Sequence, residues 1–306
     1  MLRSLFIALS ESKGIRSMAE HSAVGRKVSR RYVAGLTVED LIVATIAMNR
    51  VGVRVTVDNL GENVTNREQA QQSKALYHRL LDEIERRKLD ANVSLKLTHL
   101  GLDLDEALAR ATVEELLDHA IAIDSFIRID MEGSRYTQKT LDMVRELHRR
   151  PRAAGHIGTV LQAYLYRTEE DARLLCAEGI RIRLCKGAYD EPAAIAYPRK
   201  ADVDANYIKV AKQILGSGVF HGLATHDEKI IQTMKGWAVQ KGVPRTAFEF
   251  QMLHGVRRDL QERLAREGWG VRCYLPFGTE WYPYFMRRLA ERPANVLFLA
   301  KNFFKG

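Results

Sequence analysis

Short runs rich in β-branched residues alternate eight times with longer amphipathic stretches after residue 50. This alternation predicts parallel strands that are joined by helices, which makes the fold class α/β. Eight strand–helix units within roughly 250 residues favour a closed (β/α)8 barrel of the TIM type over an open sheet. The predicted strands are residues 54–61, 92–101, 126–133, 158–164, 180–187, 219–226, 247–253 and 271–278.

The first 50 residues lack strand patterns. The segment LTVEDLIVATIAMNRVG predicts a helix whose N-terminal cap lies near Thr37. We therefore expect residues 1–50 to form an N-terminal helical arm and residues 51–306 to form the barrel, which would be the catalytic domain. Basic residues outnumber acidic ones over residues 1–33, so peripheral contact with a membrane surface is an open alternative for the arm.

The net charge of +9 raises the question of nucleic acid, but the Lys and Arg runs alternate with acids at helical spacing. That spacing is typical of a solvated outer face, so we expect no nucleic-acid partner. The three cysteines form no C-x-x-C pair, which fits a reducing, cytoplasmic compartment. No apolar run approaches the ~20 residues that cross a bilayer.

The predicted strands end in polar residues. In a barrel of this type the active site lies at the C-terminal ends of the strands. An ionisable group facing inward costs several kcal/mol unless it is paired or bound by ligand, so a purely structural barrel would carry Val, Ile and Leu there. The alternative interpretation is a set of structural ion pairs. The residues that we place at strand ends are Lys96, Asp130, Gln162, Arg183, Lys186, Thr225, His226 and Tyr274.

The fifth unit, RIRLCKGAYDEP, runs from a strand into a Lys186–Gly187–Ala188–Tyr189 turn. A lysine, a glycine that lets a ligand approach the backbone, and the following N–H groups together form a cradle for an anion. A Schiff-base lysine is a rival use of Lys186 or of Lys96.

The last unit, VRCYLPFGTEWYPYFMRRLAER, predicts a helix with Pro283 in its first turn. Helical spacing then places Tyr284, Arg287 or Arg288, and Glu291 along one stripe. Adjacent arginines, one of them braced by Glu291, suit a carboxylate or a phosphate. A solvated arginine pair is the alternative interpretation.

Other signatures of known chemistry are missing from the sequence. There is no dinucleotide fingerprint between a strand and a helix, no Walker loop and no G-x-S-x-G. His221 and His226 are five residues apart on one predicted strand and therefore face opposite sides, so we expect no metal site.

Several motifs resemble the proline dehydrogenase family, in its monofunctional bacterial type and in the matching domain of the bifunctional proline-utilisation proteins. The resemblance covers roughly residues 54–300. It rests on VDNLGE, SLKLTHLG, RIDMEGS, LQAYLYRT, RLCKGAYDEP, LATHD, FEFQMLHGV and above all YLPFGTEWYPYFMRRLAER.

The resemblance implies a barrel flavoenzyme that binds FAD without a covalent bond. Such an enzyme oxidises L-proline to 1-pyrroline-5-carboxylate, the first step of proline catabolism, and passes the electrons to a membrane quinone. A transient contact with 1-pyrroline-5-carboxylate dehydrogenase and a peripheral position at the inner face of the membrane are further expectations.

Site residues follow from the same resemblance, position by position. Asp130 matches the family's active-site carboxylate and would orient Lys96 or an arginine, while Arg183 would stabilise charge on the reduced flavin. The substrate-binding residues would be Lys96, Leu253, Tyr274, Tyr284, Arg287 and Arg288. The residues against FAD would be Met131 through its backbone, Gln162, Arg183, Lys186, Gly187, Ala188, Thr225 and His226, with Tyr189 and Glu291 in support.

The sequence departs from the family pattern at Asp190, Cys185 and His254, which puts local flavin contacts in question. Two alternatives stay open. One is a Schiff-base lyase or aldolase that uses Lys186, and the other is a flavin-free imino-acid-binding protein. The large aromatic Tyr274 resembles the proline-specific enzymes of the family, whereas relatives that oxidise hydroxyproline carry a smaller residue.

Overall fold

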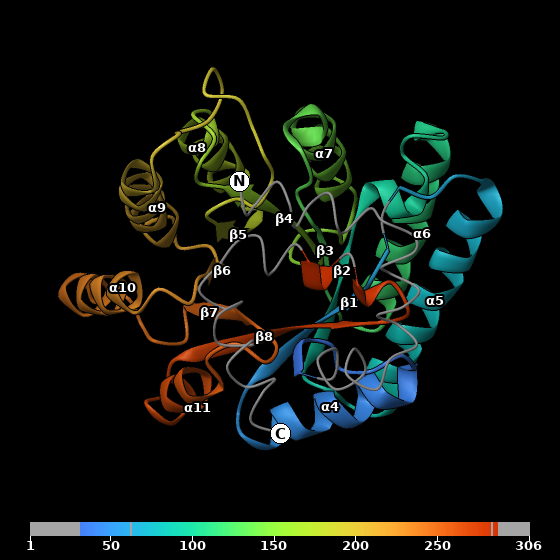
Figure 1. The fold of residues 1–306 in the computed structure, drawn as a ribbon, viewed down its shortest axis with the longest axis horizontal. Helices are drawn as coiled ribbons and strands as arrows, with labels where there is room; N and C mark the ends of the chain where they lie inside the picture. The colour runs from blue at the N-terminus through green and yellow to red at the C-terminus, as the bar shows by residue number, and fades with distance from the viewer. Residues whose placement is uncertain (1–30, 62, 283, 287–306) are drawn as a thin grey trace.

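Eight parallel strands close into a barrel at the centre of the molecule (Figure 1). The computed structural model describes residues 31–61, 63–282 and 284–286. Each strand pairs with the next along the chain, and β1 pairs with β8 to close the ring. The strands are β1 (Arg54–Asn59), β2 (Ala91–Leu95), β3 (Ile127–Ile129), β4 (Ile157–Gln162), β5 (Arg181–Cys185), β6 (His221–Ala224), β7 (Phe248–Leu253) and β8 (Gly270–Phe277).

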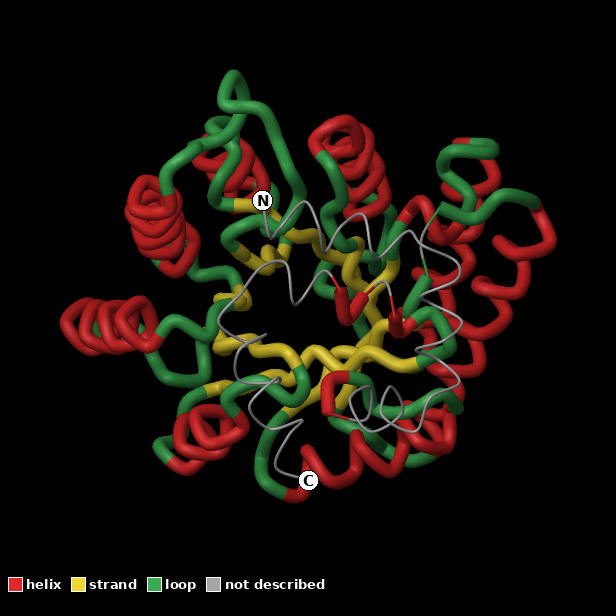
Figure 2. Tube along the Cα trace, viewed as in Figure 1, coloured by secondary structure: helices red, strands yellow, loops and turns green. Residues whose placement is uncertain are grey.

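Helices surround the barrel on its outside (Figure 2). A helix follows each of the first seven strands, so the structure confirms the predicted (β/α)8 architecture over the described residues. The helices are α4 (Val38–Arg50), α5 (Arg67–Arg86), α6 (Glu106–Ala122), α7 (Ser134–His148), α8 (Thr168–Ala177), α9 (Lys200–Leu215), α10 (Glu228–Lys241) and α11 (Arg258–Arg266), with a short 3-10 turn, η1 (Leu97–Leu100).

The predicted cap at Thr37 is present. Its hydroxyl accepts a hydrogen bond from the Asp40 N–H, and the Asp40 carboxylate accepts one from the Thr37 N–H, a reciprocal capping box. The buried apolar residues of α4, among them Leu41 and Ile42, belong to the main core and pack beside β1 and β8. The described part of the predicted arm is therefore packed against the barrel wall.

The apolar core lies between the strands and the helices, and the lumen is polar. Alternate strand residues such as Val55, Val93 and Ile127 join the helix-facing core. Their neighbours face inward, where hydrogen bonds connect strands across the lumen. The middle layer of the lumen consists of Thr56, Ser94, Asp130, Arg183, Gln251 and Tyr274.

Two of the predicted strand ends are displaced. Arg183 is the third residue of β5, and Tyr274 lies within β8, which continues to Phe277. β8 extends further because Pro276 and Phe277 stay in register with Asp58 and Asn59 of β1. Both side chains therefore start deeper in the lumen than the sequence suggests. Gln162 does end β4, whereas Lys96 and Asp130 each follow the last residue of their strand.

No helix among the described residues is both long enough and apolar enough to span a bilayer.

Candidate active site

Asp130 is the centre of a buried hydrogen-bond network. Its Oδ1 accepts hydrogen bonds from the Ser94 hydroxyl at 2.6 Å and from Arg183 Nη1 at 2.7 Å. Its Oδ2 accepts one from the Tyr274 hydroxyl at 2.8 Å. Three donors from β2, β5 and β8 thus converge on one carboxylate that is 8% exposed. This arrangement fixes the charged side chains beneath the C-terminal mouth of the barrel.

Arg183 crosses the lumen. Besides Asp130, its guanidinium contacts Gln251 Oε1 at 2.5 Å and lies 5.1 Å from the centre of the Tyr274 ring. Burial and then the carboxylates of Asp130 and Asp58 raise the pKa of Tyr274 well above its ordinary value, so its hydroxyl remains a donor. The arginine that Asp130 holds is Arg183.

Lys96 is paired with Asp58, a residue that the motif search did not single out. Lys96 Nζ lies 3.0 Å from Asp58 Oδ1 and 3.2 Å from Oδ2. Asp58 is 1% exposed, and burial raises its pKa while Lys96 lowers it. The sequence did contain a signal for Asp58. It lies in the VDN segment near the C-terminal end of the first predicted strand, the same kind of position as the other predicted site residues.

Lys186 lies outside the lumen between α9 and α10. Its Nζ is 2.5 Å from Asp204 Oδ1 and 3.0 Å from Asp227 Oδ2. Burial raises the pKa of both carboxyl groups, but Lys186 together with Lys200 at Asp204, and Lys186 together with backbone N–H groups at Asp227, holds both pKa values below their ordinary values. An anion at this lysine would compete with two carboxylates of the protein. Formation of a Schiff base would require Lys186 to leave both ion pairs, so this placement disfavours that use of Lys186.

Gly187 allows the backbone of the turn to pass close to the Tyr164 ring. Its φ is +114°, and a Cβ there would lie 2.1 Å from a ring carbon of Tyr164. A side chain at this position would therefore collide with that ring. Ala188 is exposed and Tyr189 is half-buried beside it.

Residues at the ends of β4 and β7 and just after β6 present polar groups. Gln162 Nε2 donates to the Glu132 carbonyl at 3.0 Å, and His226 Nε2 accepts from the Leu253 N–H at 2.9 Å. Thr225 Oγ1 accepts from the Asp227 N–H. The inward positions of β6 are Gly222 and Ala224, and the Gln251 side chain fills the space that a side chain at Gly222 would take. Donors and acceptors at these strand ends fit the hydrogen-bonding edge of a flavin.

The predicted wall of the substrate pocket is described only in part. Leu253 is half-buried at the end of β7, and its register partner on β8 is Tyr274. Tyr284 is buried in a cluster with Leu60, which follows β1. Met131 is buried directly after Asp130. Three further predicted residues, Arg287, Arg288 and Glu291, and also Pro283, lie outside the described residues.

The three departures from the family pattern lie at or after the ends of β5 and β7. Cys185 is half-buried at the end of β5 and Asp190 is exposed. His254 donates its backbone N–H to the Tyr274 carbonyl, and burial lowers the pKa of its ring to about 4. Within the described part of the chain, no three His, Cys, Asp or Glu side chains are grouped as a metal site.

Known proteins match the chain along its length. The sequence model of the proline dehydrogenase family matches residues 42–301. Proline dehydrogenase 1 of Bacillus subtilis subsp. natto is 40% identical over 306 residues, which is 100% of both chains. Proline dehydrogenase of Deinococcus radiodurans is 38% identical over 309 residues, which covers 100% of this chain and 99% of that protein.

Solved structures share the fold. Proline utilization A from Bdellovibrio bacteriovorus, inactivated by N-propargylglycine, superposes with a TM-score of 0.83 at 23% identity. The match covers 94% of this chain and 36% of that one, so this chain spans about a third of the larger protein. The barrel, the polar strand ends and the full-length sequence matches agree, and the chain belongs to the proline dehydrogenase family of enzymes.

Proposed function

We propose that this enzyme oxidises L-proline to 1-pyrroline-5-carboxylate with FAD as a non-covalent cofactor. The observation that carries the proposal is the convergence of Asp130, Arg183 and Tyr274 inside a barrel whose sequence matches proline dehydrogenases along its full length. A buried network of charges at the catalytic end of a barrel is typical of an active site.

Bound FAD would accept the hydride that leaves the ring carbon beside the proline nitrogen. The residues that would hold it are Arg183, the Lys186–Gly187–Ala188 turn, Gln162, Thr225, His226 and the backbone of Met131. Lys186 would exchange its ion pair with Asp204 or Asp227 for one with a cofactor phosphate. A carboxylate and a phosphate are both anions, so either one complements the charge of the lysine.

The protein's own side chains would fix the substrate. Lys96, Arg287 and Arg288 would bind its carboxylate, while Tyr274, Tyr284 and Leu253 would surround its ring. Asp58 holds the Lys96 ammonium at 3.0 Å and so limits the positions that this charge can take. Asp130 already accepts hydrogen bonds from three donors, so we assign it a positioning role toward Arg183 and Tyr274.

Electrons would leave to a membrane quinone, and the product would pass to 1-pyrroline-5-carboxylate dehydrogenase in a transient contact. A position in the cytoplasm with peripheral contact at the membrane face fits this electron acceptor.

An absorption spectrum tests the proposal. The purified protein should show flavin absorption that bleaches under anaerobic conditions on addition of L-proline, and acid should release the flavin as FAD. A colourless protein that takes up no added FAD would contradict the proposal and would favour a flavin-free binding protein. Trapping of a substrate on Lys186 by borohydride would favour the lyase instead.

A further inference from the structure

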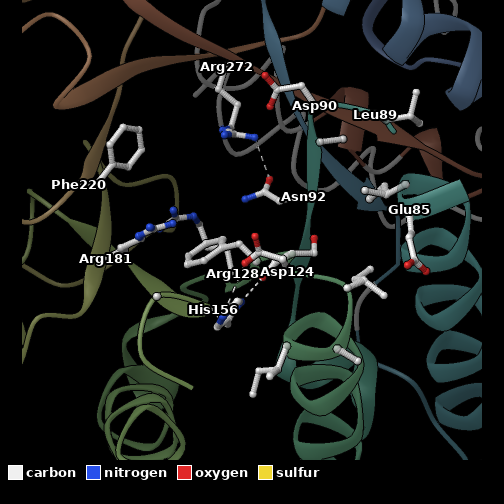
Figure 3. A pocket seen from close by; sticks show the side chains of 18 of the residues that line it. Glu85, Leu89, Asp90, Asn92, Asp124, Arg128, His156, Arg181, Phe220 and Arg272 are labelled. Carbon is white, nitrogen blue, oxygen red and sulfur yellow. Dashed lines mark hydrogen bonds and ion pairs between the residues drawn. The ribbon is translucent and has the colours of Figure 1, made fainter. Parts of the chain in front are cut away.

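The end of the barrel opposite the candidate active site contains a cavity. It has a volume of about 880 Å³ and lies at the N-terminal ends of the strands, away from the candidate active site (Figure 3). Its inner wall carries Arg128 of β3, Arg181 of β5 and Arg272 of β8, with Glu249 of β7 between them. A volume between about 300 and 1,000 Å³ is usual for a small-molecule site.

The charges on the inner wall of this cavity are unbalanced. Glu249 is 1% exposed and is paired with Arg272, whose Nε lies 2.6 Å from Glu249 Oε1. Glu249 is the one buried carboxylate in the cavity wall among the described residues. The buried Arg128 and the half-buried Arg181 and Arg272 share it, and Asp124 at the rim also attracts Arg181. An unpaired charge below the surface is energetically costly, because the protein interior solvates it less well than water does.

Two of the arginines have unused hydrogen-bonding capacity. Arg128 is 3% exposed, and its Nη1 donates to the Thr159 carbonyl, but its Nε has no hydrogen-bond partner among the described residues. The Arg181 guanidinium forms neither a hydrogen bond nor an ion pair with any residue in the described ranges and contacts the Phe126 and Phe220 rings. Burial lowers the pKa of both side chains, and repulsion from Arg272 adds to it while Glu249 opposes it.

Phenylalanine rings hold these arginines in place. The Arg128 and Arg181 guanidinium carbons lie 4.8 and 5.3 Å from the centre of the Phe126 ring, and Arg181 also lies 5.6 Å from that of Phe220. Stacking on a ring orients a guanidinium and leaves its in-plane N–H donors available. In Figure 3, Arg181, Arg128 and Arg272 approach the cavity from three sides.

The rim of the cavity is mixed in charge. Glu85, Asp90 and Asp124 are exposed there, as are Lys88 and Arg152. Asp90 lies 3.5 Å from Arg54, and Asp124 lies 4.0 Å from His156. The excess of positive charge is therefore confined to the inner wall, where water is least able to screen it.

We propose that this cavity binds a polyvalent phosphate-class anion through Arg181, Arg128 and Arg272. Planar guanidinium groups match the oxygen pairs of a phosphate, and an anion with at least two negative charges would balance the excess on the wall. The site is separate from proline oxidation and does not depend on the proposed function.

Calorimetric titration with pyrophosphate, in the presence and absence of saturating FAD, tests this proposal, because FAD would occupy the proposed cradle at the other end of the barrel and leave the arginine cavity open. We expect saturable binding at constant ionic strength, and parallel titrations with orthophosphate and ADP identify the size of ligand preferred. Arg181→Gln should weaken pyrophosphate binding at least tenfold, since Arg181 supports no other ion pair in the described structure. The matched control is Arg173→Gln, which removes an exposed arginine elsewhere on the surface.

Three results would overturn the proposal. These are no binding beyond that of chloride at matched ionic strength, equal affinity in Arg181→Gln, or an equal loss in Arg173→Gln. If Arg181→Gln does not fold, the wild-type protein still decides the question. Phenylglyoxal should label Arg181, and pyrophosphate should protect it while chloride does not, whereas unchanged labelling would refute the site.

Discussion

The Tyr274 hydroxyl on β8 donates a 2.8 Å hydrogen bond to Oδ2 of Asp130, the residue that follows β3. The same carboxylate accepts a hydrogen bond from Arg183, and the Arg183 guanidinium lies over the Tyr274 ring. Each of the three side chains thus fixes the other two. A change at Tyr274 should alter both the shape of the pocket and the position of the charges beneath it.

Tyr274 is expected to set the choice of imino acid. We predict that kcat/KM for L-proline exceeds that for trans-4-hydroxy-L-proline by at least about 10-fold, because a 4-hydroxyl would be buried without a partner. Tyr274→Ser should narrow the gap, mainly by slowing proline oxidation. Tyr274→Phe keeps the ring and should keep the preference. Steady-state kinetics with both substrates measure this, and a full preference in the Ser variant would show that Tyr274 does not line the pocket.

The Lys96–Asp58 pair is expected to affect stability in a pH-dependent way. Lys96→Met leaves the Asp58 carboxylate buried and unpaired, which should lower the free energy of unfolding by about 3 to 5 kcal/mol at pH 8. Burial raises the pKa of Asp58, so the folded variant binds a proton more readily than the unfolded chain. The loss should therefore shrink as the pH falls toward 5.

Urea denaturation at the two pH values measures the effect of Lys96→Met. The double variant Lys96→Met/Asp58→Asn serves as the control, since it removes both charges and should recover most of the lost stability. A Lys96→Met protein as stable as the wild type at pH 8 would contradict the importance of this pair.

Arg288 is expected to bind the substrate carboxylate. Removal of one partner of a desolvated charge pair costs about 2 to 5 kcal/mol, so Arg288→Met should weaken proline binding by roughly 30-fold or more. Flavin content should not change. Titration with an unreactive carboxylate analogue of proline, followed in the flavin spectrum, separates binding from turnover. Affinity equal to that of an Arg173→Met surface control would place Arg288 outside the site.

Two buried histidines are expected to make the protein sensitive to mild acid. Burial, with some repulsion from nearby cations, lowers the pKa of His221 to about 3 and of His99 to about 4. Both pKa values lie below that of an unfolded histidine, near 6.5, so the unfolded chain binds more protons in this range. Above about pH 6.5 the two histidines do not reduce the free energy of unfolding. Below it, the free energy of unfolding falls by up to about 1.4 kcal/mol per pH unit for each histidine as the pH drops toward 4.

Chemical denaturation between pH 7.5 and 4.5 measures this slope. Relative to the wild type, His221→Gln should reduce the slope of the unfolding free energy against pH by the contribution of about one bound proton. His156→Gln, which replaces a half-buried ring, is the matched control. An unchanged slope in His221→Gln would contradict the assignment.

The barrel was predictable because its signals are local. The change from period-2 to period-3.6 patterns marks each strand and helix, and the capping box of Thr37 and Asp40 is contained within four residues. The strand ends were less certain. Arg183 and Tyr274 lie inside their strands, because register with the neighbouring strands, which the sequence of one strand does not contain, decides where pairing stops.

The candidate site divides in the same way. The sequence by itself determined which polar residues gather at one end of the barrel, since the C-terminal ends of parallel strands all lie on one side. Only the tertiary structure decided which of them are partners. Lys96 pairs with Asp58, 38 residues away, and Arg183 reaches across the lumen to Thr56, 127 residues away. Such pairs depend on barrel diameter, strand register and side-chain length together, and no local pattern in the sequence records that combination.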